Sequence, residues 1–401
     1  MALKYNPTRV EANIEPKMLI WAREESGFTQ KEAAKAAQTS LKNIVNAELG
    51  ASRLTYNQFR RLAKFYGRPM ATFYLDSPPA DFKLPDFRSN KTVGYTKAEG
   101  NIQIKIRELY EKKKFAEELY DILGSDYKYD FVNQFDLTTP ASKAAKFIRN
   151  VLHASTSDLS GLSDPDLFRY WTKKIESLGI LVFQFGKVDL EILRGFVFSE
   201  LPFPLIALNS RDSTYAKVFT MIHEITHVIL NFSGMCEPND GMQVVVKNQE
   251  LENFFDEVAS LVLLPPSEFN AEIGDKTQEE LEPFLIAKSR EFKISYSVIL
   301  VRLRKLKKIG ILTFNWWLDE LKYRRKSREA KEEARKNELD SGGPSYYQII
   351  HSQISKSYMK MVVDSLNNDL ISFHNAMEYV GDKHDTLKTY LEEIEGGIHK
   401  L

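Results

Sequence analysis

The stretch VFTMIHEITHVILNF, residues 218 to 232, is apolar along almost its whole length but carries three ionisable side chains at its centre. An apolar run of this length is typical of a buried helix. His223, Glu224 and His227 are expensive to bury unless each of them has a partner. The sequence therefore predicts that something compensates for their burial, and the spacing of the three residues indicates what it is.

The two histidines lie four residues apart, which on a helix places them about 40° apart around the axis and one turn apart along it. Two imidazole nitrogens on adjacent turns can bind one Zn²⁺ ion. Glu224, beside the first histidine, is placed to hold a metal-bound water and accept its proton. We therefore expect His223 and His227 as metal ligands and Glu224 as the catalytic base. A chance match on an ordinary helix is the alternative, and the apolar flanks argue against it.

A third ligand is expected from the helical pattern NQELENFFDEVASLVLLP, residues 248 to 265. A catalytic zinc site takes three protein ligands and leaves one position to water. Glu252 and Asp256 share a helix face with apolar residues that indicate the core, so we expect Glu252 to bind the metal. Asp256, one turn further on, is expected to hydrogen-bond a ligating histidine. A solvated charge on the helix surface is the alternative for Asp256.

Three short segments before the histidine helix predict strands: ILVFQFG at 180–186, RGFVFS at 194–199 and PLIALN at 204–209. Each is rich in β-branched or aromatic residues. Helical patterns surround them, so the fold class expected is mostly α with a small β-sheet, α+β rather than doubly wound. We also expect PLIALN to offer an edge at which a substrate strand could pair.

The N-terminal segment, residues 1 to 79, indicates a five-helix unit with clear start signals. In TQKEAAKAAQTSLKNIVNAELG, residues 29 to 50, Thr29 and Glu32 form a capping box, and Ser40 caps a second helix. The pattern predicts a helix, a tight turn and a helix. The segment holds twelve Lys or Arg against seven Asp or Glu, a net charge of +5 inside a neutral chain. This local excess suits a surface that faces phosphates.

The second helix of this pattern would enter the DNA major groove by its N-terminal side. The expected base-reading residues are Ser40, Lys42, Asn43 and Asn46. Gln30 and Arg53 are better placed for the phosphates of the backbone. The alternative is a small helical docking or dimerisation domain whose polar face is merely solvated.

Composition excludes several other classes of protein. Lys plus Arg and Asp plus Glu both number 55 in 401 residues, so any nucleic-acid surface must be local. The single cysteine, Cys236, cannot form a disulfide within the chain, which suits a cytoplasmic location. No apolar signal core or long apolar run is present, so we expect no membrane segment. The remaining histidines have no ligand spacing.

These patterns divide the chain into four expected parts. They are a helix-turn-helix domain (1–79), a linker and helical connector (80–135), a zinc metallopeptidase domain (136–313) and a helical C-terminal region (314–401). Residues 315 to 340 form a charged run of both signs. Such a run more often forms an exposed, salt-bridged helix than a second DNA site.

The motifs together resemble the ImmA/IrrE family of metallopeptidases. The resemblance is carried by GFVFSELPFPLIALN, by the histidine helix and by ELENFFDEVASLVLLP after it. Weaker matches are LPDFRS at 84–89, SREFKISYSVILVRL at 289–303 and SGGPSYYQ at 341–348. A repressor-type (XRE) helix-turn-helix domain precedes this region. Members of the family often carry Asn at the position of Asp256.

The resemblance implies a zincin-like minimal core, with His223, His227 and Glu252 as zinc ligands and Glu224 as the general base. It implies a DNA-binding transcriptional regulator fused to a zinc-dependent endopeptidase that cleaves a regulatory protein. Its expected partners are operator DNA, a protein substrate and a second copy of the chain. The alternative function is a repressor or antitoxin of a toxin–antitoxin or phage-related module. That protein would bind operator DNA and a partner protein, and its zinc site would be structural or weakly active.

Overall fold

The computed structural model describes residues 10–79, 97–124, 127–231, 234–236, 249–269, 278–338, 352–381 and 387. The LPDFRS and SGGPSYYQ matches lie outside these residues. The chain divides into two compact units, Met1–Lys114 with Lys187–Asp189 and Phe115–Gly186 with Leu190–Leu401. The boundary between the two units falls within one long helix, α5 (Lys97–Leu123).

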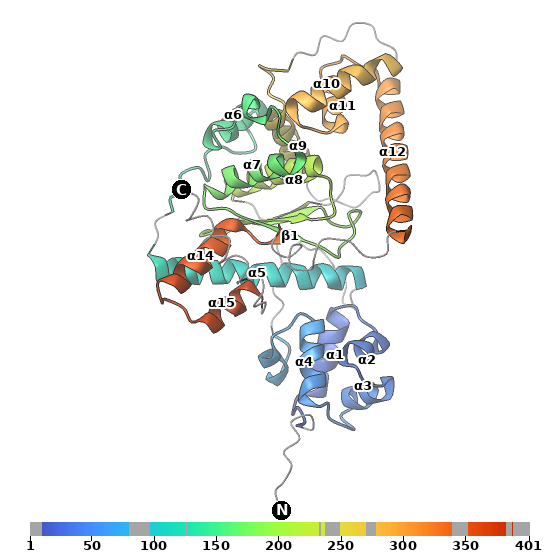
Figure 1. The fold of residues 1–401 in the computed structure, drawn as a ribbon, viewed down its shortest axis with the longest axis vertical. Helices are drawn as coiled ribbons and strands as arrows, with labels where there is room; N and C mark the ends of the chain where they lie inside the picture. Colours follow the sequence, from blue (N-terminus) through green and yellow to red (C-terminus); the bar gives the residue numbers. More distant parts are fainter. Residues whose placement is uncertain are drawn as a thin grey trace, which may run out of the picture. The chain divides into compact units, whose positions relative to one another are not determined.

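The first unit is a bundle of short helices, as expected (Figure 1). They are α1 (Pro16–Glu25), α2 (Gln30–Ala37), α3 (Leu41–Glu48), α4 (Tyr56–Phe65) and a 3₁₀ helix, η2 (Met70–Tyr74). Its core is built from small and aromatic side chains, including Ala33, Ile44 and Phe59. Alanine on α2 lets the neighbouring helices approach closely, and Ile44 of α3 fills the space between them.

Local signals in the sequence set the ends of α2 and α3. Thr29 and Glu32 form the predicted capping box at the start of α2. The turn that follows α2 passes through Gln38 in the left-handed conformation. The Ser40 hydroxyl then accepts the amide of Asn43 and begins α3. These caps satisfy backbone N–H groups that a helix start leaves without partners.

The second unit contains the predicted small sheet, and the expectation of an α+β fold is confirmed. Its strands are β1 (Leu181–Phe185), β2 (Gly195–Phe198), β3 (Leu205–Asn209) and β4 (Gly234–Cys236). The strand order is β1-β3-β2-β4. β1 pairs with β3 in parallel, and β2 pairs antiparallel with both β3 and β4.

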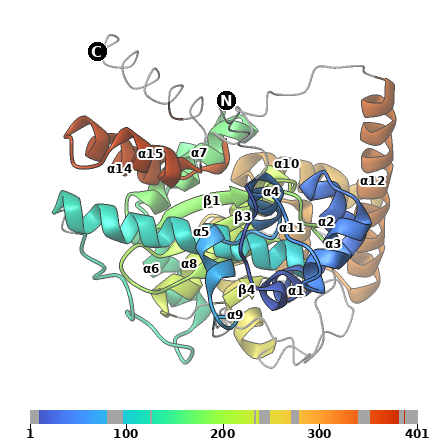
Figure 2. The ribbon, with the colours of Figure 1, turned by 90° about the horizontal axis from the view of Figure 1, so that it is seen from below.

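The expectation that PLIALN offers a free edge is wrong. This segment is β3, which is flanked by β1 on one side and β2 on the other. Figure 2 shows β1 beside β3. All five of its residues are buried. A continuous apolar run such as LIALN is typical of an internal strand, because both faces and both edges are covered.

Helices cover both faces of this sheet (Figure 1). The face that contains Val182 shares a core with α7 (Asp164–Glu176), α8 (Thr214–Ile229) and α9 (Gln249–Leu263). Phe183, which points to the other face, contacts Tyr358 of α14 (Lys356–Asn367). Side chains of a strand alternate between faces, so one strand serves both layers.

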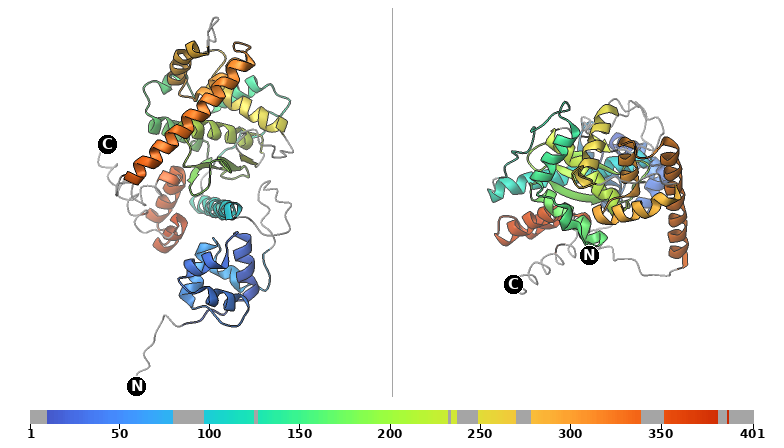
Figure 3. Two further views of the ribbon diagram at one scale, coloured as in Figure 1. Left: turned by 90° about the vertical axis from the view of Figure 1, so that its right-hand side faces the viewer. Right: turned by 90° about the horizontal axis from the view of Figure 1, so that it is seen from above.

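The remaining helices of the second unit complete its core or extend from it. They are α6 (Ala141–Val151), η3 (Thr156–Leu159), η4 (Glu279–Leu281), α10 (Glu282–Phe292), α11 (Tyr296–Lys305), α12 (Ile311–Glu338) and α15 (Phe373–Val380). The charged run predicted as one exposed helix is α12, which Figure 3 shows as a single long element. No helix in the described ranges combines the length and the apolar character needed to cross a membrane.

A buried carboxylate at the end of α7 and a side chain of β1 tie the C-terminal helices to the rest of the second unit. The Ser355 hydroxyl, at the N-cap of α14, donates to Oε1 of Glu176 at 2.5 Å, and the backbone amide of Ser357 donates to the other carboxylate oxygen at 3.3 Å. Gln184 of β1 donates to the Ser352 carbonyl at 2.7 Å. Burial raises the pKa of Glu176 above its ordinary value. The C-terminal region is therefore part of the second unit.

Candidate metal centre and nucleic-acid interface

Helix α8 carries the H-E-x-x-H residues into the centre of the second unit. Its N-cap is Ser213, whose hydroxyl accepts the amide of Ala216. The helix packs on β2 and β3 and is also covered by α7 and α9 (Figure 1). As a result His223, Glu224 and His227 are at most 1 % exposed. The predicted burial of these three ionisable groups is confirmed.

The structure brings the predicted donor atoms to one point. Nε2 of His223 lies 3.2 Å from Nε2 of His227 and 3.3 Å from Oε2 of Glu252, which is on α9. One ligand atom from each of the three residues lies within 4.8 Å of the others. Glu252 is half-buried, whereas both histidines are buried. Residues separated by some thirty positions in sequence thus converge because α8 and α9 pack side by side.

This donor set fits a zinc ion. Two imidazoles and a carboxylate are one of the ligand sets of catalytic zinc sites. In a tetrahedral site with zinc–nitrogen bonds of roughly 2.0–2.1 Å, two ligand nitrogens are about 3.3 Å apart. The 3.2 Å between the two histidine nitrogens agrees with that spacing. Among the described residues three protein ligands converge, which leaves the fourth position of a tetrahedral zinc site to water.

Two side chains of α9 fix the orientation of the histidines. Oδ1 of Asp256 lies 3.0 Å from Nδ1 of His223, so the carboxylate can accept the Nδ1 proton and leave Nε2 facing Glu252. The buried ring of Phe255 packs 4.0 Å from the His227 ring and 5.6 Å from the His223 ring, centroid to centroid. Asp256 therefore restricts the rotation of the His223 ring, and Phe255 restricts that of the His227 ring.

Gly195 of β2 was not predicted as a site residue, but it lies beside the Glu224 carboxylate of α8. A Cβ at this glycine would stand 3.4 Å from Oε1 of Glu224, 2.6 Å from the Thr220 methyl and 2.9 Å from the Ala207 carbonyl oxygen. Only a residue without a side chain lets β2 approach α8 this closely. A glycine inside the strand pattern RGFVFS was the available signal, because such a glycine often marks a close approach.

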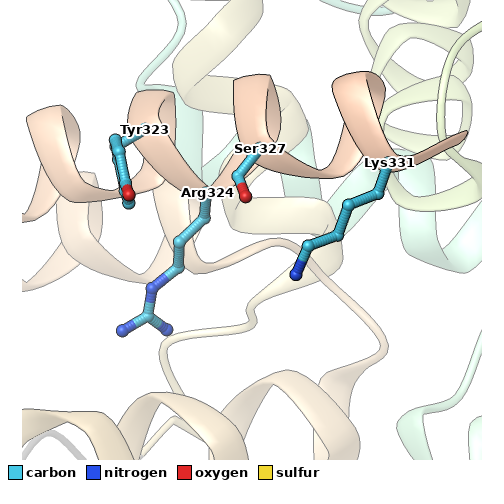
Figure 4. Close-up of a pocket in the computed structure, with 4 residues that line it drawn as sticks. All are labelled: Tyr323, Arg324, Ser327 and Lys331. Atoms are coloured by element: carbon cyan, nitrogen blue, oxygen red, sulfur yellow. The ribbon is translucent and has the colours of Figure 1, made fainter. Parts of the chain in front are cut away.

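Other parts of the second unit carry polar features that are separate from these donors. Burial lowers the pKa of Lys217, whose Nζ donates to Gln184 at 3.1 Å. A hollow of about 320 Å³ lies on α12 and is lined by Tyr323, Arg324, Ser327 and Lys331 (Figure 4). None of these four residues belongs to the predicted metal centre.

In the first unit, α3 presents most of the predicted DNA-contacting residues to solvent. Ser40, Lys42 and Asn43 are exposed at its N-terminal end, and Asn46 is half-exposed one turn later. Arg53 is exposed in the loop after α3. The Asn43 side chain donates to the Thr39 hydroxyl at 2.9 Å, which orients it at the start of the helix. These positions agree with a helix that presents its N-terminal side to a groove.

Gln30 takes part in a network that the sequence analysis did not foresee. Its amide donates to Oε2 of the buried Glu48 at 2.8 Å. Arg23 of α1 donates to both oxygens of the same carboxylate, at 2.7 and 3.1 Å. Glu48 thus joins α1, α2 and α3, and a bidentate arginine pair of this kind is geometrically specific. In the sequence, the feature that could have revealed this network was a glutamate directly after Ala47, a buried residue of α3.

The fold and the site define a helix-turn-helix protein whose second, α+β unit carries a His-His-Glu cluster with both histidines buried. Residues 175–304 match the family model of the IrrE N-terminal-like domain, a peptidase family, and residues 19–73 match a helix-turn-helix model. The first match contains α8 and α9, and the second contains α2 and α3. No curated protein matches the chain. The predicted combination of an ImmA/IrrE-type domain with a preceding helix-turn-helix domain is confirmed.

Proposed function

We propose that the chain is a cytoplasmic, DNA-binding transcription regulator whose second unit is a zinc-dependent endopeptidase that cleaves a regulatory protein. The observation that carries the proposal is the convergence of His223, His227 and Glu252 within 4.8 Å, next to a buried Glu224. Two imidazole nitrogens and a carboxylate oxygen that converge in this way form one of the ligand sets of catalytic zinc sites.

Each residue of the centre has a distinct part in the proposed reaction. His223, His227 and Glu252 would hold the ion, which when bound polarises a carbonyl and lowers the pKa of water. Glu224 positions the attacking water, takes its proton at the carboxylate and passes the proton to the leaving amine. Asp256 accepts from Nδ1 of His223 and keeps Nε2 directed at the donor cluster. Apolar walls, including Phe255, exclude bulk water.

The first unit supplies the proposed DNA-binding activity. Two copies would place α3 in successive major grooves of an operator, as helix-turn-helix proteins usually bind DNA in pairs. Ser40, Lys42, Asn43 and Asn46 would contact base edges, and Gln30 and Arg53 the phosphates. Because Glu48 orients Gln30, that amide is held in place before DNA binds.

Two matched variants test the enzymatic part. Glu224→Gln preserves the shape of the side chain but cannot accept a proton, so it should retain zinc and lose peptide cleavage. His223→Ala removes a ligand and should lose both. Zinc is measured by mass spectrometry of the purified protein. Cleavage is measured on a library of peptides from a digested proteome, in which new termini are counted.

The outcomes separate the two functions considered from the sequence. Wild-type protein that holds no zinc would overturn the endopeptidase proposal. If wild type holds zinc, and Glu224→Gln represses its operator in cells and responds to its inducing signal as wild type does, the repressor or antitoxin function is favoured. In that outcome the metal centre serves the structure of the second unit. An operator for this assay is selected from random duplex DNA with the full-length chain.

A further inference from the structure

Helix α12 exposes a continuous stripe of side chains along one face. The stripe consists of Leu312, Trp316, Asp319, Tyr323, Lys326 and Ala330, all of which are exposed. Leu312 is 78 % and Tyr323 70 % exposed, which is unusual for large apolar or aromatic residues. Successive members are four or three residues apart, which is the alternating a/d spacing of a coiled-coil seam.

The opposite face of α12 is anchored to its own unit. Trp317 is buried and its indole N–H donates to the Gln278 carbonyl at 3.0 Å. Arg324 pairs with Glu282 on α10 and with Glu320 on α12 itself. These contacts fix the rotation of the helix about its own axis. The stripe therefore faces away from the unit that α12 belongs to.

We propose that α12 pairs with α12 of a second copy of this chain in an antiparallel helix pair. The inference goes beyond the proposed function, because it assigns the surface through which two copies meet without DNA. In an antiparallel coiled coil, a positions of one helix face d positions of the other. Leu312 then faces Ala330 of the partner copy, Trp316 faces Lys326, and Asp319 faces Tyr323. Each of these layers occurs twice.

The charges on the stripe select this partner and this direction. In the antiparallel register the layers of Asp319 and Lys326 are neighbours, so the acidic side chain of one copy lies next to the basic side chain of the other. The ammonium group of Lys326 also lies against the Trp316 ring, a favourable cation–π contact. A parallel pair would instead stack Asp319 on Asp319 and Lys326 on Lys326, which costs free energy through like-charge repulsion.

The size of the facing side chains is also complementary. The large Leu312 meets the small Ala330, and the phenol hydroxyl of Tyr323 can donate to the Asp319 carboxylate. Two of the three kinds of layer thus pair a large side chain with a smaller one, which favours close packing. The third kind is the contact of Trp316 with Lys326.

The oligomeric state of the full-length chain tests the proposal. Sedimentation velocity without DNA should show a dimer that dissociates on dilution. Leu312→Glu and Tyr323→Glu each place a charge in the seam and should raise the dimer dissociation constant more than about tenfold. Ile311→Glu is the matched control. Ile311 is also exposed, but it lies about 100° away around the helix, so this variant should dimerise as wild type does.

Disulfide trapping in a Cys236→Ser background tests the direction of the pair. Leu312→Cys combined with Ala330→Cys should cross-link two copies, because facing positions come within disulfide range. Ala330→Cys alone should not, since position 330 is far from the two-fold axis. Cross-linking of the single variant would overturn the antiparallel arrangement. A wild-type chain that stays monomeric, or a dimer that Leu312→Glu and Tyr323→Glu leave intact, would overturn the whole inference while leaving the zinc and cleavage assays unaffected.

Discussion

Helices α8 and α12 of the second unit distribute their side chains in opposite ways. α8 buries two histidines and a glutamate that a helix normally keeps in water. α12 exposes a leucine, a tryptophan and a tyrosine that a helix normally buries. Both arrangements are costly for an isolated chain. The donor atoms that converge beside α8 suit a cation, and the exposed stripe of α12 suits a second helix.

The two helices differ in how much of the binding site for a partner the chain itself provides. Around α8, Glu252 and Asp256 approach His223 to 3.3 and 3.0 Å, so the donor set is complete before any ion binds. Along α12, the chain supplies only the anchoring face and leaves the stripe to solvent. Substitutions near α8 should therefore strongly lower the stability or the zinc affinity of a single protomer. Substitutions on the exposed face of α12 should change the stability of a single protomer little.

The largest effect is expected for Phe255→Ala, which removes the ring that packs on both histidines. Truncating a fully buried phenylalanine typically costs about 3–5 kcal/mol of unfolding free energy. The His227 ring would also gain rotational freedom, so zinc affinity should fall. Denaturant unfolding and zinc titration measure the two effects. Phe254→Ala is the matched control, because Phe254 is only partly buried and should change zinc affinity little.

The second-largest effect is expected for Gly195→Ala, which should lower the free energy of unfolding by about 1–3 kcal/mol through overpacking. The new methyl group would meet the Thr220 side chain at 2.6 Å and a backbone carbonyl at 2.9 Å, so β2 and α8 must separate. Thermal unfolding measures the loss. Gly310→Ala is the control, since nothing lies within 4 Å of a Cβ there. Equal stability of the two variants would show that the approach of β2 to Glu224 is not tight.

Asp256→Asn should weaken zinc binding by about 10–100-fold with little change in folding. The amide is neutral, so it loses the charge that favours the Nδ1 proton of His223 and strengthens the ring as a ligand. Isothermal titration with zinc measures the change. Glu250→Gln, an exposed residue of the same helix, should bind zinc as wild type does. If Asp256→Asn binds zinc with the affinity of wild type, then Asp256 does not support His223 and is a solvated charge on the helix surface.

Much of this contrast could be predicted from sequence, because periodicity and spacing report local structure directly. The H-E-x-x-H spacing predicted a helix with both histidines on one face, and the face shared by Glu252 and Phe255 predicted which side of α9 packs inward. The family matches confirm the two domain types. The three predicted strands formed as expected, with the first and second two residues shorter and the third one residue shorter than proposed.

The features that were missed depend on tertiary contacts. β3 was expected at an edge, and only the pairing of β1 beside it removes that edge. Gly195 gains its significance from α8, which follows it by some twenty residues in sequence. The charged run was expected to be solvated, and its polar composition conceals Trp316 and Tyr323, two large members of the exposed stripe. Whether such residues face solvent or the core depends on Trp317 and Arg324, which fix the rotation of α12.

Arg324→Ala should have the smallest effect, although Arg324 makes more polar contacts than most residues of α12. The pairs with Glu282 and Glu320 are partly exposed, and ion pairs of that kind contribute at most about 1 kcal/mol. The buried Trp317 continues to hold the helix, so both unfolding and dimerisation should change little. Denaturant unfolding and sedimentation velocity are the measurements. A loss as large as that of Phe255→Ala would mean that α12 is anchored by charge rather than by its tryptophan, and the seam could then rotate out of register.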